Sequence, residues 1–161
     1  RQNHTAIEPL RKLLANSHLP QSRLHALRSL SGLNELADAN IARALSDSHL
    51  SIREHAMQLA ESRLDQSPQL LASVIALANH SNERLRVQAA FSLGESLAPS
   101  AATALATLAR ESADNQQLRT AVLSSVGQQP LPLFQLLLDD AGNSDLLKQL
   151  AAIIGSRGIA F

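Results

Sequence analysis

Apolar residues recur along this chain at intervals of three and four, with polar residues between them. One such set is Leu70, Leu71, Val74 and Leu77, and Leu10, Leu13 and Leu14 form another. This spacing predicts amphipathic helices. We expect five helix pairs, with first helices over 6–16, 38–46, 68–79, 99–111 and 131–140, and second helices over 22–33, 51–64, 84–95, 116–127 and 145–155.

An arginine returns near the start of successive second helices. Arg23, Arg53, Arg86 and Arg119 are separated by 30, 33 and 33 residues, and each opens a similar apolar segment. A fifth copy of the segment lacks the arginine. Self-similarity at this period is typical of proteins built from stacked repeats.

Helix-boundary residues follow the same period. Pro68 and Pro99 fall at the first position of predicted helices, where the missing N–H is not needed. The turn segments 16–18, 47–49, 80–82 and 113–115 offer side chains that would cap the second helices. Four glycines near second-helix ends, Gly32, Gly94, Gly127 and Gly155, predict left-handed C-terminal caps.

The expected fold class is therefore all-α, an α-solenoid of about five helix pairs that forms a single domain over residues 1–161. One pair cannot bury its own apolar face, so neighbouring pairs must share a core. The apolar residues Ile7, Leu10, Ile159 and Phe161 near the chain ends predict further repeats or domains beyond both ends. Because the chain also begins without methionine, we expect it to be an excised part of a larger multidomain protein.

Composition narrows the function classes. The chain is 45% hydrophobic, its formal net charge is zero, and its only aromatic residues are Phe91, Phe134 and Phe161. A neutral chain without tyrosine or tryptophan lacks the basic and stacking surface that nucleic-acid binding requires. No apolar run is long enough to span a bilayer, so we expect no direct membrane insertion. The basic residues gathered in 1–30 are interpreted as an ordinary solvated end rather than an anion site.

The repeat resembles the HEAT repeat, and the run Asn82–Gly94 is its clearest copy. In that pattern a short turn is followed by a hydrophobic residue, an arginine, and an alanine-rich helix ending in Leu-Gly. The short form of the repeat is similar to that of phycobilin lyases. The resemblance covers the whole chain and implies a helical scaffold whose second helices line the inner surface.

A narrower resemblance rests on the runs 9–15, 23–33, 53–61 and 118–126. They look like the HEAT segments of large planctomycete-type bacterial proteins described as membrane-bound dehydrogenases. In that family a β-propeller precedes the HEAT segment and a c-type haem-binding domain follows it. The resemblance implies a spacer in an exported, redox-associated protein, located in the periplasm or cell envelope. No catalytic or haem residue carries over, because neither motif lies within this sequence.

The row of repeated arginines, Arg23, Arg53, Arg86 and Arg119, has two interpretations. Four guanidinium groups in a row can bind phosphate or carboxylate. They can also pair with turn carboxylates and carbonyls and so brace one repeat against another. Asp47 and Asp114 lie six and five residues before Arg53 and Arg119, which favours the structural interpretation.

Candidate chemistry elsewhere is sparse. His25 and His55 share one repeat position, but equivalent positions on adjacent helices are about 8–10 Å apart, too far for a shared ion. His18, His49 and His80 fall in turns. The chain has no cysteine and no nucleophile motif, so we expect no metal, no cofactor and no enzyme activity in this segment.

The function most consistent with these features is a non-catalytic scaffold, spacer or protein-interaction module. Polar positions of the second helices are the candidate partner surface: His25, Arg28, Ser29, His55, Gln58, Gln88, Ser92, Ser124 and Ser125. The expected partner is a protein, either a neighbouring domain of the parent chain or another molecule. The alternative is an accessory subunit of a bilin-lyase-like enzyme that handles tetrapyrroles.

Overall fold

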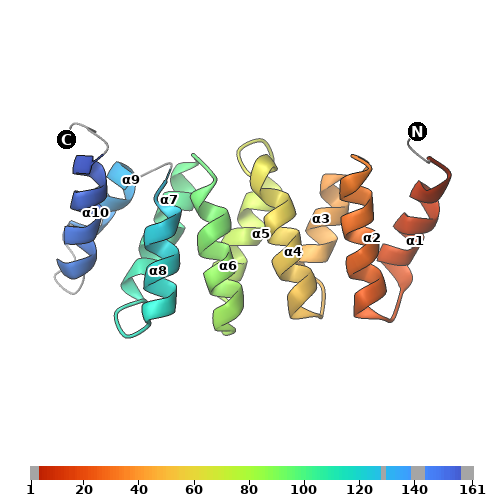
Figure 1. Ribbon diagram of the computed structural model, residues 1–161, viewed down its shortest axis with the longest axis horizontal. Coiled ribbons are helices and arrows are strands. Elements are labelled where there is room, and N and C mark those ends of the chain that lie inside the picture. Colours follow the sequence, from red (N-terminus) through yellow and green to blue (C-terminus); the bar gives the residue numbers. More distant parts are fainter. Residues whose placement is uncertain (1–3, 128–129, 139–143, 157–161) are drawn as a thin grey trace. The chain divides into compact units, whose positions relative to one another are not determined.

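The computed structural model describes residues 4–127, 130–138 and 144–156 (Figure 1). Over these residues all regular secondary structure is helical, and there is no strand. The all-α fold class predicted from the apolar spacing is therefore confirmed. The helices gather into two compact units, residues 1–60 and residues 61–161, called the N-terminal and C-terminal units below.

The N-terminal unit contains two helix pairs. After the short 3-10 helix η1 (His4–Ala6), α1 (Ile7–Asn16) pairs with α2 (Pro20–Gly32), and α3 (Asp38–Leu45) pairs with α4 (Leu50–Ala60). Helix α2 also packs against α3 and α4. Both α2 and α4 bury apolar side chains, namely Ala26, Leu27 and Leu30 on α2 and Ile52, Ala56 and Met57 on α4.

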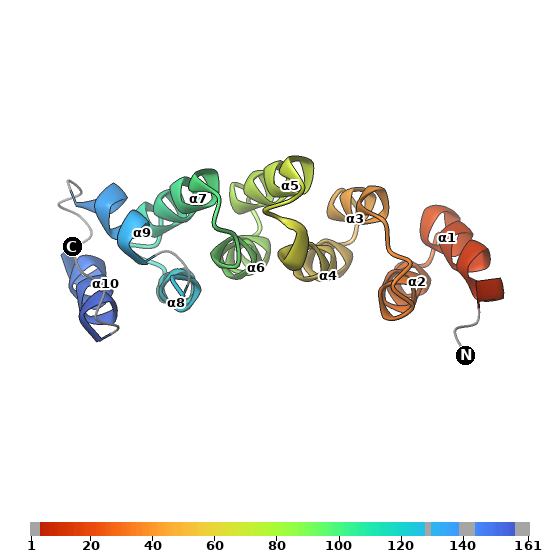
Figure 2. The same cartoon turned by 90° about the horizontal axis from the view of Figure 1, so that it is seen from above.

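The C-terminal unit contains three helix pairs. It opens with the 3-10 helix η2 (Glu61–Arg63), and the pairs are α5 (Pro68–Ala78) with α6 (Glu83–Gly94), α7 (Pro99–Arg110) with α8 (Gln116–Ser125), and α9 (Pro130–Leu137) with α10 (Ser144–Ser156). Within this unit the first helices α5, α7 and α9 form one layer and the second helices α6, α8 and α10 form another (Figure 2).

The predicted helix ranges match the observed ones with small differences. Helix α2 begins at Pro20 rather than at residue 22, because proline is accommodated at the first helical position. The predicted second helix 51–64 ends as an α-helix at Ala60 and continues as η2. Residues 139 and 140 of the predicted helix 131–140 lie outside the described residues.

The turn segments cap two second helices as predicted. Asn82 Oδ1 accepts a hydrogen bond from the backbone N–H of Arg84, and Asn115 Oδ1 accepts one from Leu118. Helix α2 departs from the prediction, since Leu19 occupies its N-cap position and makes no side-chain cap. The hydroxyl of Ser17 instead accepts from the N–H of Leu19.

The predicted left-handed caps at glycine are wrong. Gly32, Gly94, Gly127 and Gly155 all lack a left-handed φ, and Gly32 and Gly94 are the last residues of their helices. The turn after α2 uses Asn34 instead, with φ 58°. The N–H of Glu35 bonds to Leu30 O at 2.9 Å and the N–H of Asn34 bonds to Ser31 O at 2.9 Å, which is the Schellman arrangement with asparagine at its left-handed position.

Gly94 has a different role. A β-carbon at this position would lie 2.3 Å from the backbone oxygen of Ser125. The glycine therefore permits close packing of α6 against α8, and the same position in α2 carries no such constraint because nothing lies within 4 Å of a β-carbon built on Gly32. No described helix is long and apolar enough to cross a lipid bilayer.

Candidate functional site

The repeated arginine binds the same backbone feature in three helix pairs. Arg23 Nη1 donates to the carbonyl of Ser17 at 2.8 Å, Arg53 Nε donates to the carbonyl of Asp47, and Arg119 Nη2 donates to the carbonyl of Ala113 at 3.0 Å. Each acceptor lies six residues before its arginine, in the turn between the first and second helices. The guanidinium therefore satisfies a carbonyl exposed where a first helix ends.

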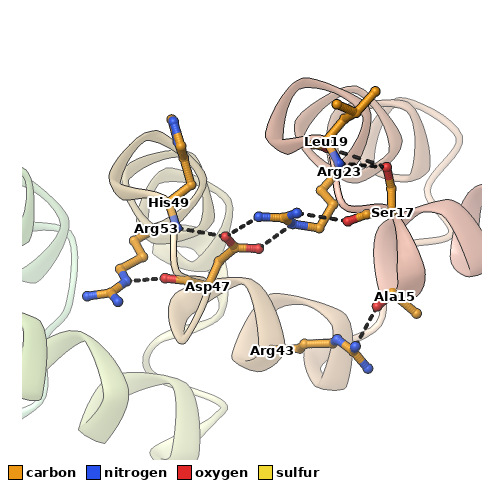
Figure 3. Close-up of polar contacts among 8 residues, drawn as sticks. All are labelled: Ala15, Ser17, Leu19, Arg23, Arg43, Asp47, His49 and Arg53. Carbon is orange, nitrogen blue, oxygen red and sulfur yellow. Dashed lines mark hydrogen bonds and ion pairs between the residues drawn. The ribbon is translucent and has the colours of Figure 1, made fainter.

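In the N-terminal unit, Asp47 makes the polar contacts that join the two helix pairs (Figure 3). Its carboxylate accepts two hydrogen bonds of 2.7 Å from Arg23, from Nε to Oδ2 and from Nη2 to Oδ1. Oδ1 also accepts from the backbone N–H of His49 at 2.8 Å. One residue thus ties the first helix pair to the second, and its own carbonyl accepts from Arg53.

The ion pair is well shielded, with side-chain exposures of 13% for Arg23 and 12% for Asp47. Burial alone would raise the pKa of Asp47, but the hydrogen bonds from Arg23 and from the His49 backbone outweigh it, and the pKa is lowered. The hydrogen bond to Asp47 raises the pKa of Arg23 despite the opposing effect of burial. Both charges are stabilised in the folded state.

In the C-terminal unit, an ion pair between Arg86 and Glu111 joins one helix pair to the next. Glu111 was not predicted as a partner of the repeated arginine. The sequence spacing could have identified it, since Glu111 lies 25 residues after Arg86 and Asp47 lies 24 residues after Arg23. Both acceptors sit at the end of the next first helix along the chain.

The expected pairing of Asp114 with Arg119 is wrong. Asp114 is exposed and has no hydrogen bond or ion pair to Arg119 in the described part of the chain. Arg119 bonds to the carbonyl of the preceding residue, Ala113, because the turn presents its backbone toward the helix. The Nε atoms of Arg119 and Arg86 are buried and have no hydrogen-bond partner among the described residues.

Two first helices end with an arginine that bonds to a neighbouring first helix. Arg43 Nη2 donates to Ala15 O at 2.6 Å, which joins α3 to α1. Arg110 Nη2 donates to Leu136 O at 2.8 Å, which joins α7 to α9. A cation at the carbonyl end of a helix is also favoured by the helix dipole. These residues had not been singled out from the sequence, because their spacing is not shared by all repeats.

The candidate partner surface is partly assembled in the N-terminal unit. Arg28 Nη2 on α2 contacts His55 Nδ1 on α4 and donates to Gln58 Oε1 at 2.9 Å. Gln58 Oε1 lies 3.2 Å from His55 Nδ1. His25, Arg28, Ser29 and Gln58 are exposed, and His55 is half-buried. The structure thus brings three of the predicted residues into one cluster across two helices.

The predicted surface residues of the C-terminal unit behave differently. Ser92 is fully buried, accepts from Gln88 Nε2 at 3.2 Å and donates to Glu61 Oε1 at 2.8 Å. Ser125 is 7% exposed and donates back to Ala121 O at 2.6 Å. Ser92 and Ser125 are therefore corrected from surface to interior positions, because Ser92 bonds to Glu61 of η2 and Ser125 lies where α8 approaches Gly94 of α6. Ser124 is exposed as predicted.

Glu61 is the acceptor that the sequence did not reveal. Burial raises the pKa of Glu61, the hydrogen bond from Ser92 opposes this, and the charge of Glu95 adds to the increase. No group of three or more histidine, cysteine, aspartate or glutamate side chains in the described part of the chain is arranged to hold a metal ion.

Comparison of the chain with protein-family models, curated proteins and solved structures finds no match.

Proposed function

We propose that this chain is a non-catalytic HEAT-repeat scaffold that presents an interaction surface and spaces domains within a larger protein. The observation that carries the proposal is the repeated arginine–carbonyl bond in three helix pairs, with Ser17, Asp47 and Ala113 as acceptors. Arg23 also binds a carboxylate of the following pair, and the fourth repeated arginine, Arg86, binds a carboxylate of its following pair. These guanidinium groups stabilise the repeats and are not presented to a substrate.

The resemblance to the HEAT segments of dehydrogenase-like bacterial proteins supplies the context of the proposal. In that context the chain is a spacer or docking segment of an exported, redox-associated protein, and its partner is a neighbouring domain or another protein. Stacked helix pairs favour such a role because their second helices form an extended surface without any chemistry of their own.

The partner surface is assigned to the second-helix side of the N-terminal unit, where His25, Arg28, Ser29 and Gln58 are exposed. Exposed polar residues at equivalent positions of adjacent helices suit contacts that form without refolding. In the C-terminal unit Gln88 instead bonds to the buried Ser92, so it belongs more to the interior network than to the surface.

A photo-crosslinking amino acid placed at His25 in the full-length parent protein tests the assignment. We expect a cross-link to a neighbouring domain or a partner protein from this position. The same probe at Ala39, which is exposed on the first helix α3, is the matched control and should give none.

A variant combining Arg28→Glu with Gln58→Ala, two exposed side chains, should abolish the cross-link at position 25 without changing the melting temperature. Equal cross-linking from positions 25 and 39, or an unchanged cross-link in this variant, would overturn the assignment of the surface.

A further inference from the structure

Resting on the proposed scaffold function, we propose that the α2–α4 face of the N-terminal unit binds an acidic protein segment, with Arg28 as its principal carboxylate ligand. The face is defined by His25, Arg28 and Ser29 on α2 and by His55 and Gln58 on α4. The inference names the chemistry of the partner, which the scaffold function leaves open.

The first argument is the way Arg28 is held. Both of its hydrogen-bonded contacts, to His55 Nδ1 and to Gln58 Oε1, use the single nitrogen Nη2. Across the described residues, Nε and Nη1 of Arg28 have no hydrogen-bond partner. A guanidinium carries five N–H donors in a rigid fork, so the remaining donors are available for a carboxylate.

Holding an arginine in place also lowers the entropic cost of binding. A free arginine side chain loses rotamer freedom when it meets an anion, whereas contacts with His55 and Gln58 restrict Arg28 beforehand. His55 and Gln58 are therefore positioning residues for Arg28.

The second argument is the charge of the face. Helix α2 contains no acidic residue, and Glu54, the acidic residue of α4, is only 8% exposed. The positive charge of Arg28 is therefore not balanced by an exposed carboxylate on either helix. Over the whole sequence, residues 1–60 hold seven arginines and lysines against five acidic residues, as well as five of the six histidines.

The corresponding helix of the C-terminal unit is different. Helix α6 begins at Glu83 and is followed directly by Glu95, and both of these carboxylates are exposed. Its polar residue Gln88 bonds to Ser92, and Ser92 in turn donates to the half-buried Glu61. The cationic character of the α2–α4 face is therefore not shared by α6.

A protein segment fits this face better than a nucleic acid. Polynucleotide binding relies on several phosphate contacts and on stacking, and the face offers one fixed guanidinium and no aromatic residue. The amide of Gln58 and the hydroxyl of Ser29 add neutral hydrogen-bonding groups on neighbouring helices. Adjacent helix axes are about 8–10 Å apart, so these groups suit an extended acidic segment that crosses both helices.

The test uses fluorescence anisotropy of the whole chain with a labelled hexaglutamate peptide at low ionic strength. We expect saturable binding by the natural sequence, and a dissociation constant about tenfold higher for Arg28→Gln, as loss of a charge-assisted hydrogen-bonded pair predicts. Lys12→Gln removes the same charge from an exposed position on α1 and should change the constant less than about twofold.

Two further variants separate position from charge. Arg28→Lys keeps the charge but loses the planar fork, and should recover only part of the affinity. His55→Ala with Gln58→Ala leaves Arg28 in place but unrestrained, and should weaken binding by about threefold. All these side chains are exposed or half-buried, so the melting temperature of each variant should equal that of the natural sequence.

The inference is overturned if hexaglutamate does not bind, or if Lys12→Gln and Arg28→Gln weaken binding equally. It is also overturned if hexathymidylate binds more tightly than the peptide, or if the chain self-associates through this face. The cross-link at His25 distinguishes the two proposals. A cross-link without hexaglutamate binding removes the acidic partner and leaves the scaffold function standing.

Discussion

At the scale of single residues, the repeated arginine explains why the repeats keep a polar residue in an apolar segment. In three helix pairs its guanidinium reaches a carbonyl six residues earlier. Where a carboxylate is also in reach, as for Arg23 and Asp47, the contact joins two helix pairs. One arginine side chain thus bonds both to the turn carbonyl of its own helix pair and to a carboxylate of the next pair.

The first prediction concerns Asp47. Replacing Asp47 by Asn removes the ion pair with Arg23, and we expect the free energy of unfolding to fall by about 2 kcal/mol because a shielded guanidinium loses a charged partner. Chemical denaturation measures the change. Asp114→Asn is the matched control and should have little effect, since Asp114 is exposed and makes no ion pair with Arg119 in the described structure.

The same pair gives a pH dependence. The folded state lowers the pKa of Asp47, so the stabilisation is present above the pKa of the unfolded chain and is lost as the pH falls through the folded pKa. Glu61, whose pKa is raised, contributes with the opposite sign. The difference in unfolding free energy between the natural sequence and Asp47→Asn should therefore shrink as the solution is made acidic. A difference independent of pH would contradict the role of the ion pair.

At the scale of helices, positions that look equivalent in the sequence have different structural roles. Gly32 and Gly94 both end second helices, but only at Gly94 does the neighbouring helix approach within van der Waals distance of an added β-carbon. The two glycines differ because of the packing between helices, and the sequence of a single helix does not determine that packing.

The contrast between Gly32 and Gly94 gives a further prediction. Gly94→Ala should destabilise the C-terminal unit by about 1–3 kcal/mol, because the new methyl group would overlap the backbone of Ser125 and force α6 away from α8. Thermal and chemical denaturation measure the effect. Gly32→Ala meets no atom within 4 Å and should be neutral or stabilising by up to about 1 kcal/mol. Equal effects at the two positions would show that Gly94 is not required for close packing.

The helices themselves could be predicted from the sequence, because apolar spacing and proline at the first helical position act locally. For the contacts of the repeated arginines, the type of partner could be predicted, but not every partner residue. Arginine–carbonyl bonding within a repeat follows from sequence proximity, but the ion pair of Arg86 with Glu111 depends on how one pair meets the next. Burial of Ser92 and Ser125 was missed for the same reason, since each is polar and lies beside exposed residues in the sequence.

At the scale of the whole molecule, an overall neutral charge hides a difference between the two units. Residues 1–60 carry an excess of basic residues, whereas residues 61–161 carry nine acidic residues against seven basic ones. A surface for a protein partner is therefore best sought on the N-terminal unit, where Arg28 is held by Gln58 and His55. Under the proposed function, the repeat supplies the scaffold, and residues that differ between repeats supply the selectivity.

The measurement that tests the central claim most directly is the intact mass and visible absorbance spectrum of the native full-length protein. The account predicts a chain much larger than the 17.2 kDa of these residues, with the Soret band of a c-type haem, which would make this segment a spacer or docking module between redox domains. A haem-free product near 17.2 kDa would contradict that role.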